Sequence, residues 1–295
     1  MTLDYPGFIQ EVSSRLSSRF SEDIHLEVRG IVKNNDLKLD GLIISKEGNP
    51  ISPTLYLNPY YEDYSKGLGL DEICDNIIGT YESCKLECRL DPKMFSDFSA
   101  LRERIVYRLV SVSQNSEYLK DVPFVPFLDL AIVFVISLAV DDKSNATVLI
   151  RKNHMLMWGV GSAELMKAAI SNTKGLYPAD IFTMESVLSR YVGEEEAKSL
   201  KDCPMLVVSN KQRLYGATVM LYPDFLRELS EMVGEDYYII PSSVHELIVL
   251  PKSYVGEESS LDMMIREVNH NEVPQEDILS NHAYLYDSKE KRIIG

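Results

Sequence analysis

The stretch that decides the fold is Tyr237-Tyr-Ile-Ile-Pro-Ser-Ser-Val-His-Glu-Leu-Ile-Val-Leu250. Two short runs of β-branched and aromatic residues flank a Pro-Ser-Ser turn, which is the pattern of two strands joined by a tight connection. Polar side chains that could do chemistry also gather here between apolar segments. The stretch therefore predicts a strand pair in a β-sheet, and it is the first place to look for a site.

The composition is that of an ordinary folded protein with an acidic surface. Of the 295 residues, 45% are hydrophobic, and the 45 acidic residues outnumber the 30 basic ones to give a net charge of −15. Such a surface repels nucleic-acid phosphates and anionic lipids, so we expect no direct nucleic-acid binding and no membrane association. The simplest role of the net negative charge is to keep the protein soluble. The alternatives are that it attracts a basic protein partner or that it mimics a nucleic acid.

The sequence predicts a soluble cytoplasmic protein. Its N-terminus lacks the basic and apolar regions of a signal peptide. The longest apolar stretch, Val122 to Val140, contains Pro123, Pro126 and Asp129. Only the part from Leu130 to Val140 is free of proline and charge, and it is rich in Ile and Val, which suits a buried strand rather than a bilayer helix. We expect Leu130 to Leu138 to form a central strand covered on both faces.

We expect neither a metal nor a cofactor. In the absence of a secretory signal, Cys74, Cys84, Cys88 and Cys203 should be reduced thiols, and a zinc site would need further ligands at suitable spacing. The two Gly-x-Gly pairs that precede predicted helices lack the third glycine of a dinucleotide-binding loop.

Apolar periodicity and turn residues predict an α+β fold with mixed, largely antiparallel sheets. The expected helices cover residues 5–20, 70–82, 96–113, 162–172, 180–192, 223–233 and 260–269. The expected strands cover residues 24–32, 37–45, 53–57, 129–139, 146–151, 204–209, 214–221, 236–240 and 246–250. Residues 271–295 should be a short appended segment.

The chain lacks a flexible linker, and its best candidate boundary lies near residues 89–96. Residues 1–90 would form an N-terminal helix with a β-hairpin–helix unit, and residues 91–295 a larger α/β body. One continuous domain is the alternative.

Three segments share a strand–loop–helix pattern with similar apolar spacing in the helix. They are residues 54–78, 147–170 and 246–268. A strand followed by a helix laid across it is one packing unit, so the pattern predicts a repeated element in which the three helices pack alike.

The cluster Ser242, Ser243, His245 and Glu246 is the sharpest candidate for chemistry. On an extended strand Ser243 and His245 would point to one face, which suggests a nucleophile and its base. Residues two apart in a strand rarely reach hydrogen-bonding distance, however, and the sequence has no Gly-x-Ser-x-Gly elbow. We therefore favour a structural role for His245, with catalysis as the alternative.

Asp129 stands out because it lies within the most apolar part of the chain. A buried carboxylate is costly unless it is paired, so we expect it to meet Arg102, Arg104 or Arg108 or to cap a turn. A functional acid with a perturbed pKa is the alternative.

Aromatic side chains suggest two binding candidates. His154 and Trp158 belong to an apolar and aromatic segment that could be a binding patch or plain core. Tyr60 and Tyr61 form a second pair of candidates.

Several short segments of the sequence, taken together, resemble those of a known protein family. They are Pro53-Thr-Leu-Tyr-Leu57 with Tyr60-Tyr61-Glu62, Asp129-Leu-Ala-Ile-Val-Phe134, Leu214-Tyr-Gly-Ala217 and Ile240-Pro-Ser-Ser-Val-His-Glu246. The chain resembles, over nearly its whole length, a family of cytosolic proteins from gut Clostridia-type bacteria that is known as a domain of unknown function. The resemblance implies an association with plasmids, phages and integrative elements, and it carries over no catalytic residues.

The first hypothesis from the sequence is a non-enzymatic protein that binds another macromolecule. The resemblance suggests a mobile-element factor that inhibits or modulates a host defence or nucleic-acid-processing protein. The second hypothesis is a hydrolase centred on the cluster around His245, and a third is a DNA-mimicking inhibitor. The oligomeric state is left open.

Overall fold

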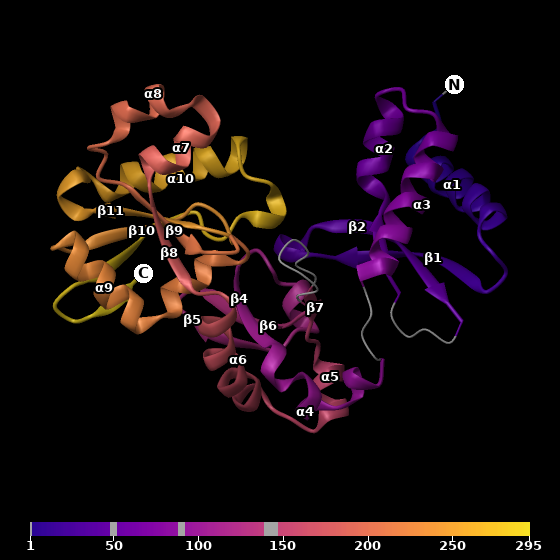
Figure 1. Ribbon diagram of the computed structural model, residues 1–295, viewed down its shortest axis with the longest axis horizontal. Helices are drawn as coiled ribbons and strands as arrows, with labels where there is room; N and C mark the ends of the chain where they lie inside the picture. Colours follow the sequence, from indigo (N-terminus) through magenta and orange to yellow (C-terminus); the bar gives the residue numbers. More distant parts are fainter. Residues whose placement is uncertain (1, 48–51, 88–91, 139–146) are drawn as a thin grey trace. The chain divides into compact units, whose positions relative to one another are not determined.

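The computed structural model describes residues 2–47, 52–87, 92–138 and 147–295. They fall into two compact units, of which the first comprises Met1–Lys33 and Leu37–Ala100. The second comprises Asn34–Asp36, Leu101–Leu138 and Asn145–Gly295. Both combine helices with β-sheets, and the strand pairings among these residues are all antiparallel (Figure 1). The predicted α+β class is confirmed.

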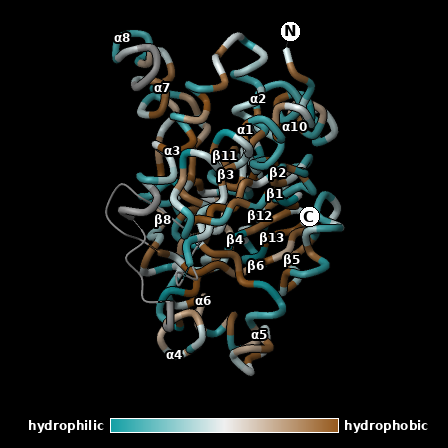
Figure 2. Tube along the Cα trace, turned by 90° about the vertical axis from the view of Figure 1, so that its right-hand side faces the viewer, coloured by the Kyte–Doolittle hydropathy of each residue, from teal (hydrophilic) through white to brown (hydrophobic). Residues whose placement is uncertain are grey.

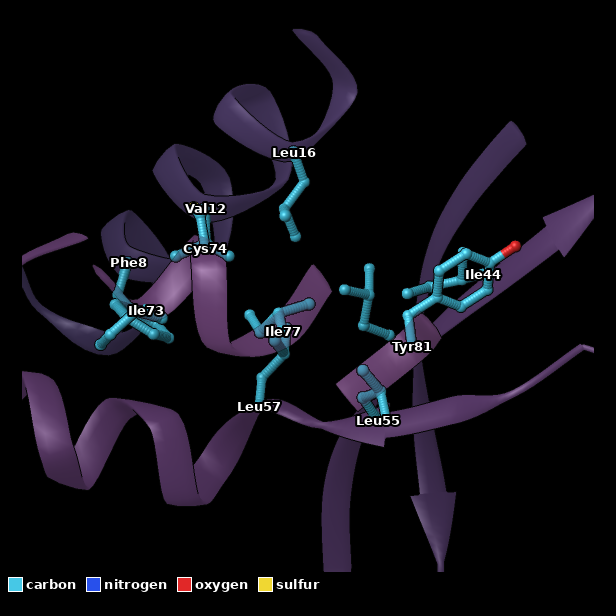
Figure 3. Close-up of a cluster of buried hydrophobic side chains, with 11 residues drawn as sticks. Phe8, Val12, Leu16, Ile44, Leu55, Leu57, Ile73, Cys74, Ile77 and Tyr81 are labelled. Carbon is cyan, nitrogen blue, oxygen red and sulfur yellow. The ribbon is translucent and has the colours of Figure 1, made fainter. Parts of the chain in front are cut away.

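The first unit packs three helices on a small sheet. Its elements are α1 (Tyr5–Arg19), β1 (Ile24–Val32), β2 (Lys38–Lys46), β3 (Thr54–Tyr56), α2 (Leu57–Ser65) and α3 (Leu70–Glu87). The Asp4 carboxylate caps α1 by accepting a hydrogen bond from the Gly7 N–H at 3.0 Å. Figure 3 shows Phe8 and Val12 of α1 near Ile73 and Cys74 of α3, and all four side chains are fully buried.

The second unit contains a sheet built around β6 (Leu130–Ser137). This strand pairs with β4 (Ile105–Ser111) on one side and with β5 (Phe124–Phe127) and β7 (Thr147–Leu149) on the other. Every residue of β6 is buried, and Figure 2 shows the strand in the colour of hydrophobic residues. The predicted central strand covered on both faces is therefore confirmed.

Both outer edges of this sheet are protected. Along β4 lies α6 (Ser162–Leu176), whose Thr173 hydroxyl accepts a hydrogen bond from the Tyr107 N–H at 3.1 Å. Asn172 donates to the Ile105 carbonyl at 2.9 Å. On the other side β5 carries Pro126, which has no N–H to offer to a further strand.

A six-stranded sheet forms the rest of the core of the second unit. Its order is β13 (Arg292–Ile294), β12 (Tyr284–Asp287), β10 (Tyr237–Pro241), β11 (Leu247–Pro251), β9 (Leu206–Asn210) and β8 (Ala179–Thr183). Helix α10 (Glu258–Asn271) covers one face through Leu261 and Ile265, which pack on Tyr238 and Ile240. Helix α9 (Pro223–Val233) lies at the other face, where the Tyr237 hydroxyl donates to the Leu226 carbonyl at 3.3 Å. The predicted strand pair around the Pro-Ser-Ser turn is thus β10 and β11 (Figure 1).

Shorter helices complete the second unit. They are α5 (Lys152–Trp158), α7 (Met184–Val192), α8 (Glu194–Ala197) and a 3-10 helix over Gly216–Leu221. Helix α4 spans Phe98–Leu101, so the sequence boundary between the two units falls within it. None of the described helices is long and apolar enough to cross a bilayer.

Four predicted elements are wrong in whole or in part. The helix expected over 96–113 is α4 followed by strand β4, because the β-branched and aromatic residues from Ile105 onward prefer a sheet. The helix over 180–192 begins as strand β8, and the strand over 214–221 is a 3-10 helix. Residues 271–295 are not appended, because their strands β12 and β13 extend the large sheet.

The predicted repeat is also wrong. A strand precedes a helix in all three segments, and α3 packs in one core with α1 and with strands β2 and β3. Helix α10 also covers the face of a sheet, but α6 lies along the edge of β4, so the three helices do not pack alike. Similar apolar spacing is required of any half-buried helix, so it does not identify a common packing partner.

Candidate functional site

The imidazole of His245 lies where three parts of the second unit meet. Its Nδ1 accepts a hydrogen bond from the Tyr215 N–H at 3.1 Å, so in the neutral ring the proton is on Nε2. Nε2 faces Oδ1 of Asp277 at 3.4 Å. The Tyr215 ring stacks on the imidazole with 5.6 Å between centroids and 16° between planes. The histidine thus fixes the loop after β9 to the turn before β11.

The backbone around His245 is closely packed. Its carbonyl accepts a hydrogen bond from the Ser209 hydroxyl at 2.7 Å, and both groups lie against Gly216. A Cβ at Gly216 would come within 2.0 Å of the Ser209 oxygen and 2.2 Å of the His245 carbonyl oxygen. The preceding residue, Tyr215, has a φ of 51°, which is uncommon for a bulky side chain. Close packing holds the strained backbone in place.

The serines of the cluster hold the turn rather than the imidazole. The Ser243 hydroxyl accepts a hydrogen bond from the His245 N–H at 3.0 Å, and the Ser242 hydroxyl lies 3.5 Å from the Glu246 carboxylate. Neither serine bonds an imidazole nitrogen in the part of the chain that the structure describes. The nucleophile–base pair of a serine hydrolase is therefore not formed here.

Replacing His245 by alanine should destabilise the protein by about 1–3 kcal/mol, because the Tyr215 N–H would lose its acceptor and the Tyr215 ring its stacking partner. His245→Asn should recover part of the loss, since an amide oxygen can accept at the position of Nδ1. Urea unfolding followed by circular dichroism measures both variants. An alanine variant as stable as the native protein would contradict the structural role.

The arginine partners expected for Asp129 are wrong. Its side chain is 48% exposed at the turn between β5 and β6, and none of the three arginines is its partner. Instead it accepts hydrogen bonds from the Tyr284 hydroxyl at 2.6 Å and from Nε2 of His282 at 3.1 Å. No local pattern in the sequence indicates this contact, because both partners come from the segment that we expected to be appended.

His282 should give the protein a measurable pH dependence. Burial lowers its pKa, but the Ala283 carbonyl and the Asp129 carboxylate outweigh burial and raise the pKa above the ordinary value. The stabilising contribution is therefore complete below the unfolded-state pKa of about 6.5 and is lost as pH rises through the folded-state value. With both groups partly in solvent, we expect less than about 1 kcal/mol.

Melting temperatures at pH 5.5 and 8.5 test this, because Asp129→Asn should lower stability more at the acidic pH. The control is Tyr284→Phe, which removes a hydroxyl that donates to the same carboxylate but leaves its charge in place. Its effect should be the same at both values. Equal losses in Asp129→Asn at the two pH values would rule out the ion pair as a source of stability.

The predicted patch around His154 and Trp158 lies on α5. Nδ1 of His154 accepts a hydrogen bond from the Arg151 N–H at 3.1 Å, and the two aromatic rings stack at 5.5 Å. Burial and the nearby Arg151 lower the pKa of His154. Both rings are half-buried, so the most exposed apolar side chains of α5 are others.

Beside α5 lies an open apolar groove with a volume of about 670 Å³. Its apolar walls include Val122, Phe124, Met155 and Leu156, and Lys152 is its charged member. Leu156 is 84% exposed and the adjacent Met157 is 53% exposed. The sequence analysis singled out this segment because of His154 and Trp158, but the exposed apolar side chains are those of Leu156 and Met157, which lie between them.

Tyr60 and Tyr61 belong to the first unit and pack against its core. The Tyr61 ring meets that of Tyr5 edge to face at 4.9 Å, and its hydroxyl donates to the Leu3 carbonyl at 3.3 Å. The Tyr60 hydroxyl lies 3.3 Å from Oγ1 of Thr80. These contacts give both residues a structural role.

The cysteines do not form a metal site in the described residues, where no group of potential ligands gathers. Cys74 is buried in the core of the first unit, and burial raises the pKa of its thiol. Cys203 is half-buried. Cys88, and the side chain of Cys84, lie outside the residues that the structure describes.

Arg108 is a feature that the sequence analysis considered only as a partner for Asp129. It is the charged residue in the middle of the apolar strand β4. Its guanidinium donates to the hydroxyls of Tyr118 and Tyr215, the latter at 3.3 Å. A lone arginine inside an apolar strand is the signal that could have drawn attention to this place.

The comparisons with known proteins give one match. No curated protein and no solved structure is similar to the chain. The family of unknown function DUF5688 matches residues 5–288 and so spans both units. The resemblance noted in the sequence is thereby confirmed at the level of the family, and the chain belongs to DUF5688.

Proposed function

We propose that this protein is a non-enzymatic binding protein that takes an apolar segment of a partner protein into the groove beside α5. The observation that carries the proposal is the exposure of Leu156, which is 84% open to solvent on the wall of that groove. Phe124, which also lines the groove, is 37% exposed. Apolar surface in a concave place is what a partner's anchoring side chain buries most favourably.

The side chains of the groove also indicate what kind of partner segment would fit it. A methionine side chain such as that of Met155 adapts to anchors of different shape. Lys152 is the charged member of the groove, so an acidic group beside the apolar anchors would pair with it, while the net charge of −15 attracts a partner that is basic elsewhere. We therefore propose a short amphipathic segment of an otherwise basic protein as the occupant.

The association with mobile elements that the sequence resemblance implies supplies a setting for the proposal. In that setting the protein would act in the bacterial cytoplasm on a host defence or nucleic-acid-processing protein. A hydrolase centred on His245 has less support, because the serine hydroxyls beside it are engaged with the turn.

A photo-crosslinking residue at position 156 would identify the partner in extracts of the native host. Isothermal titration with the purified partner then tests Leu156→Asp. We expect binding to weaken by about 30-fold or more, because a central apolar anchor contributes about 2 kcal/mol. The stability of the free protein should hardly change, since Leu156 is already exposed.

The matched control is Met232→Asp on α9, where the methionine is 62% exposed but does not line the groove. It should bind as tightly as the native protein. Equal binding by Leu156→Asp and the native protein would refute the groove as the interface. A homodimer that Leu156→Asp dissociates would mean that the groove's occupant is a second copy of the chain.

A further inference from the structure

Arg108 holds a positive charge in an unusual place. It lies on the same face of its strand as Val106 and Val110, and its cross-strand neighbour is Val133. The side chain is half-buried, and its guanidinium carbon lies 5.8 Å from the centre of the Tyr118 ring and 5.2 Å from that of Tyr215. Two aromatic rings and an apolar sheet thus surround a cation.

This cation has no anionic partner in the part of the protein described here. Every hydrogen bond of its guanidinium goes to a tyrosine hydroxyl, and no carboxylate among the described residues pairs with it. The Nε–H is shielded from solvent and has no acceptor among those residues. A partly desolvated charge without a counterion is destabilising, which makes the arrangement costly for structure alone.

The groups around Arg108 are rich in hydrogen-bond donors. A tyrosine hydroxyl that accepts from the guanidinium still has its own proton to donate. The Tyr118 hydroxyl has no acceptor among the described residues, and the Tyr215 hydroxyl lies 3.3 Å from Oγ1 of Thr147, which is another hydroxyl. The cluster therefore offers several O–H and N–H donors around one positive charge.

We propose that Arg108, Tyr118, Tyr215 and Thr147 form a binding site for an oxyanion, that is, a carboxylate or phosphate group of a ligand. A guanidinium fork matches the oxygens of either group, and bonds to a charged acceptor are about twice as strong as neutral ones. The hydroxyls would donate to the remaining oxygens. This site is distinct from the groove at Leu156, so either proposal can fail without the other.

Thermal unfolding in increasing sodium phosphate or sodium acetate tests the site, with sodium chloride at matched ionic strength as the baseline. The native protein should show a saturable rise in melting temperature beyond the chloride baseline, because a ligand that binds only the folded state stabilises it. The anion that acts at the lower concentration identifies the ligand group as phosphate or carboxylate.

Two variants locate the effect. Arg108→Lys should weaken the apparent affinity by about tenfold or more, since an ammonium group cannot form the bidentate contact. Tyr118→Phe keeps the ring and removes one donor, so it should also weaken binding and provides a test if the arginine variant does not fold. Arg102→Lys, an exposed arginine in the same unit, is the control and should bind as the native protein does.

Two results would overturn the proposal. The first is a native response to phosphate and acetate no larger than that to chloride. The second is equal affinity in Tyr118→Phe and the native protein.

Discussion

Gly216→Ala is expected to lower the free energy of unfolding by about 3 kcal/mol or more, at the upper end of overpacking effects. The new methyl carbon would stand 2.2 Å from the His245 carbonyl oxygen and 2.0 Å from the Ser209 hydroxyl. One neighbour is backbone and the other holds that backbone in place, so neither can move without breaking the hydrogen bond between them. Urea unfolding of the full chain measures the loss.

The control for this prediction is Gly175→Ala in the last turn of α6. A Cβ there would meet nothing within 4 Å. The substitution should stabilise the protein by about 0.5–1 kcal/mol, because alanine loses less backbone freedom in a helix than glycine. If Gly216→Ala were as benign as this control, the close packing described at His245 would be wrong.

Ile132→Ala should cost about 2–5 kcal/mol, the usual range for deleting a buried isoleucine to alanine. Ile132 is 3% exposed and lies between Leu109 on β4 and Val125 on β5. Neighbours on both sides belong to one sheet and can fill the cavity only in part. Urea unfolding measures the loss, and Val112→Ala, at a position that is 39% exposed, should cost less than about 0.5 kcal/mol.

Hydrogen exchange provides a second measurement on the same strand. The amides of β6 are paired on both sides, so they should exchange only through the largest openings of the second unit. Ile132→Ala should speed their exchange in proportion to its loss of stability. Fast exchange of β6 in the native protein would contradict its central position.

Elements with strong local signals could be predicted from the sequence. The Asp4 cap and the apolar stripe fix the start of α1, and Gly234, whose φ is 78°, ends α9 directly after the predicted range 223–233. The hairpin of β1 and β2 follows from alternating residues around a short turn. In each case the deciding interaction lies within a few residues along the chain.

The remaining elements depend on partners far away in sequence. Residues 105–110 fit an apolar helical spacing, but pairing with β6 and the backbone bond to Thr173 make them a strand. Helix α2 was not predicted, because it begins at Leu57 directly after β3 without a side-chain cap. Tertiary contacts decided these elements, and one sequence does not show them.

The candidate site was predictable only in its local part. The sequence singled out His245 and favoured a structural role, and its nearest hydroxyls do hold the turn. The partners of its ring, Tyr215 and Asp277, come from other loops. Asp129 was noticed for the wrong reason, since its position in an apolar run suggested burial whereas it occupies an exposed turn.

The strand order of the large sheet has a consequence for folding during synthesis. β10 lies between β11, which follows it within a few residues, and β12, which leaves the ribosome only after all of α10. Until then one edge of β10 is open, and Tyr237 lacks the stacked ring of Tyr286. While α10 is being synthesised, the nascent chain therefore exposes an unpaired edge of β10 that can pair with another chain. A pause in translation at this point would favour aggregation or the binding of a chaperone.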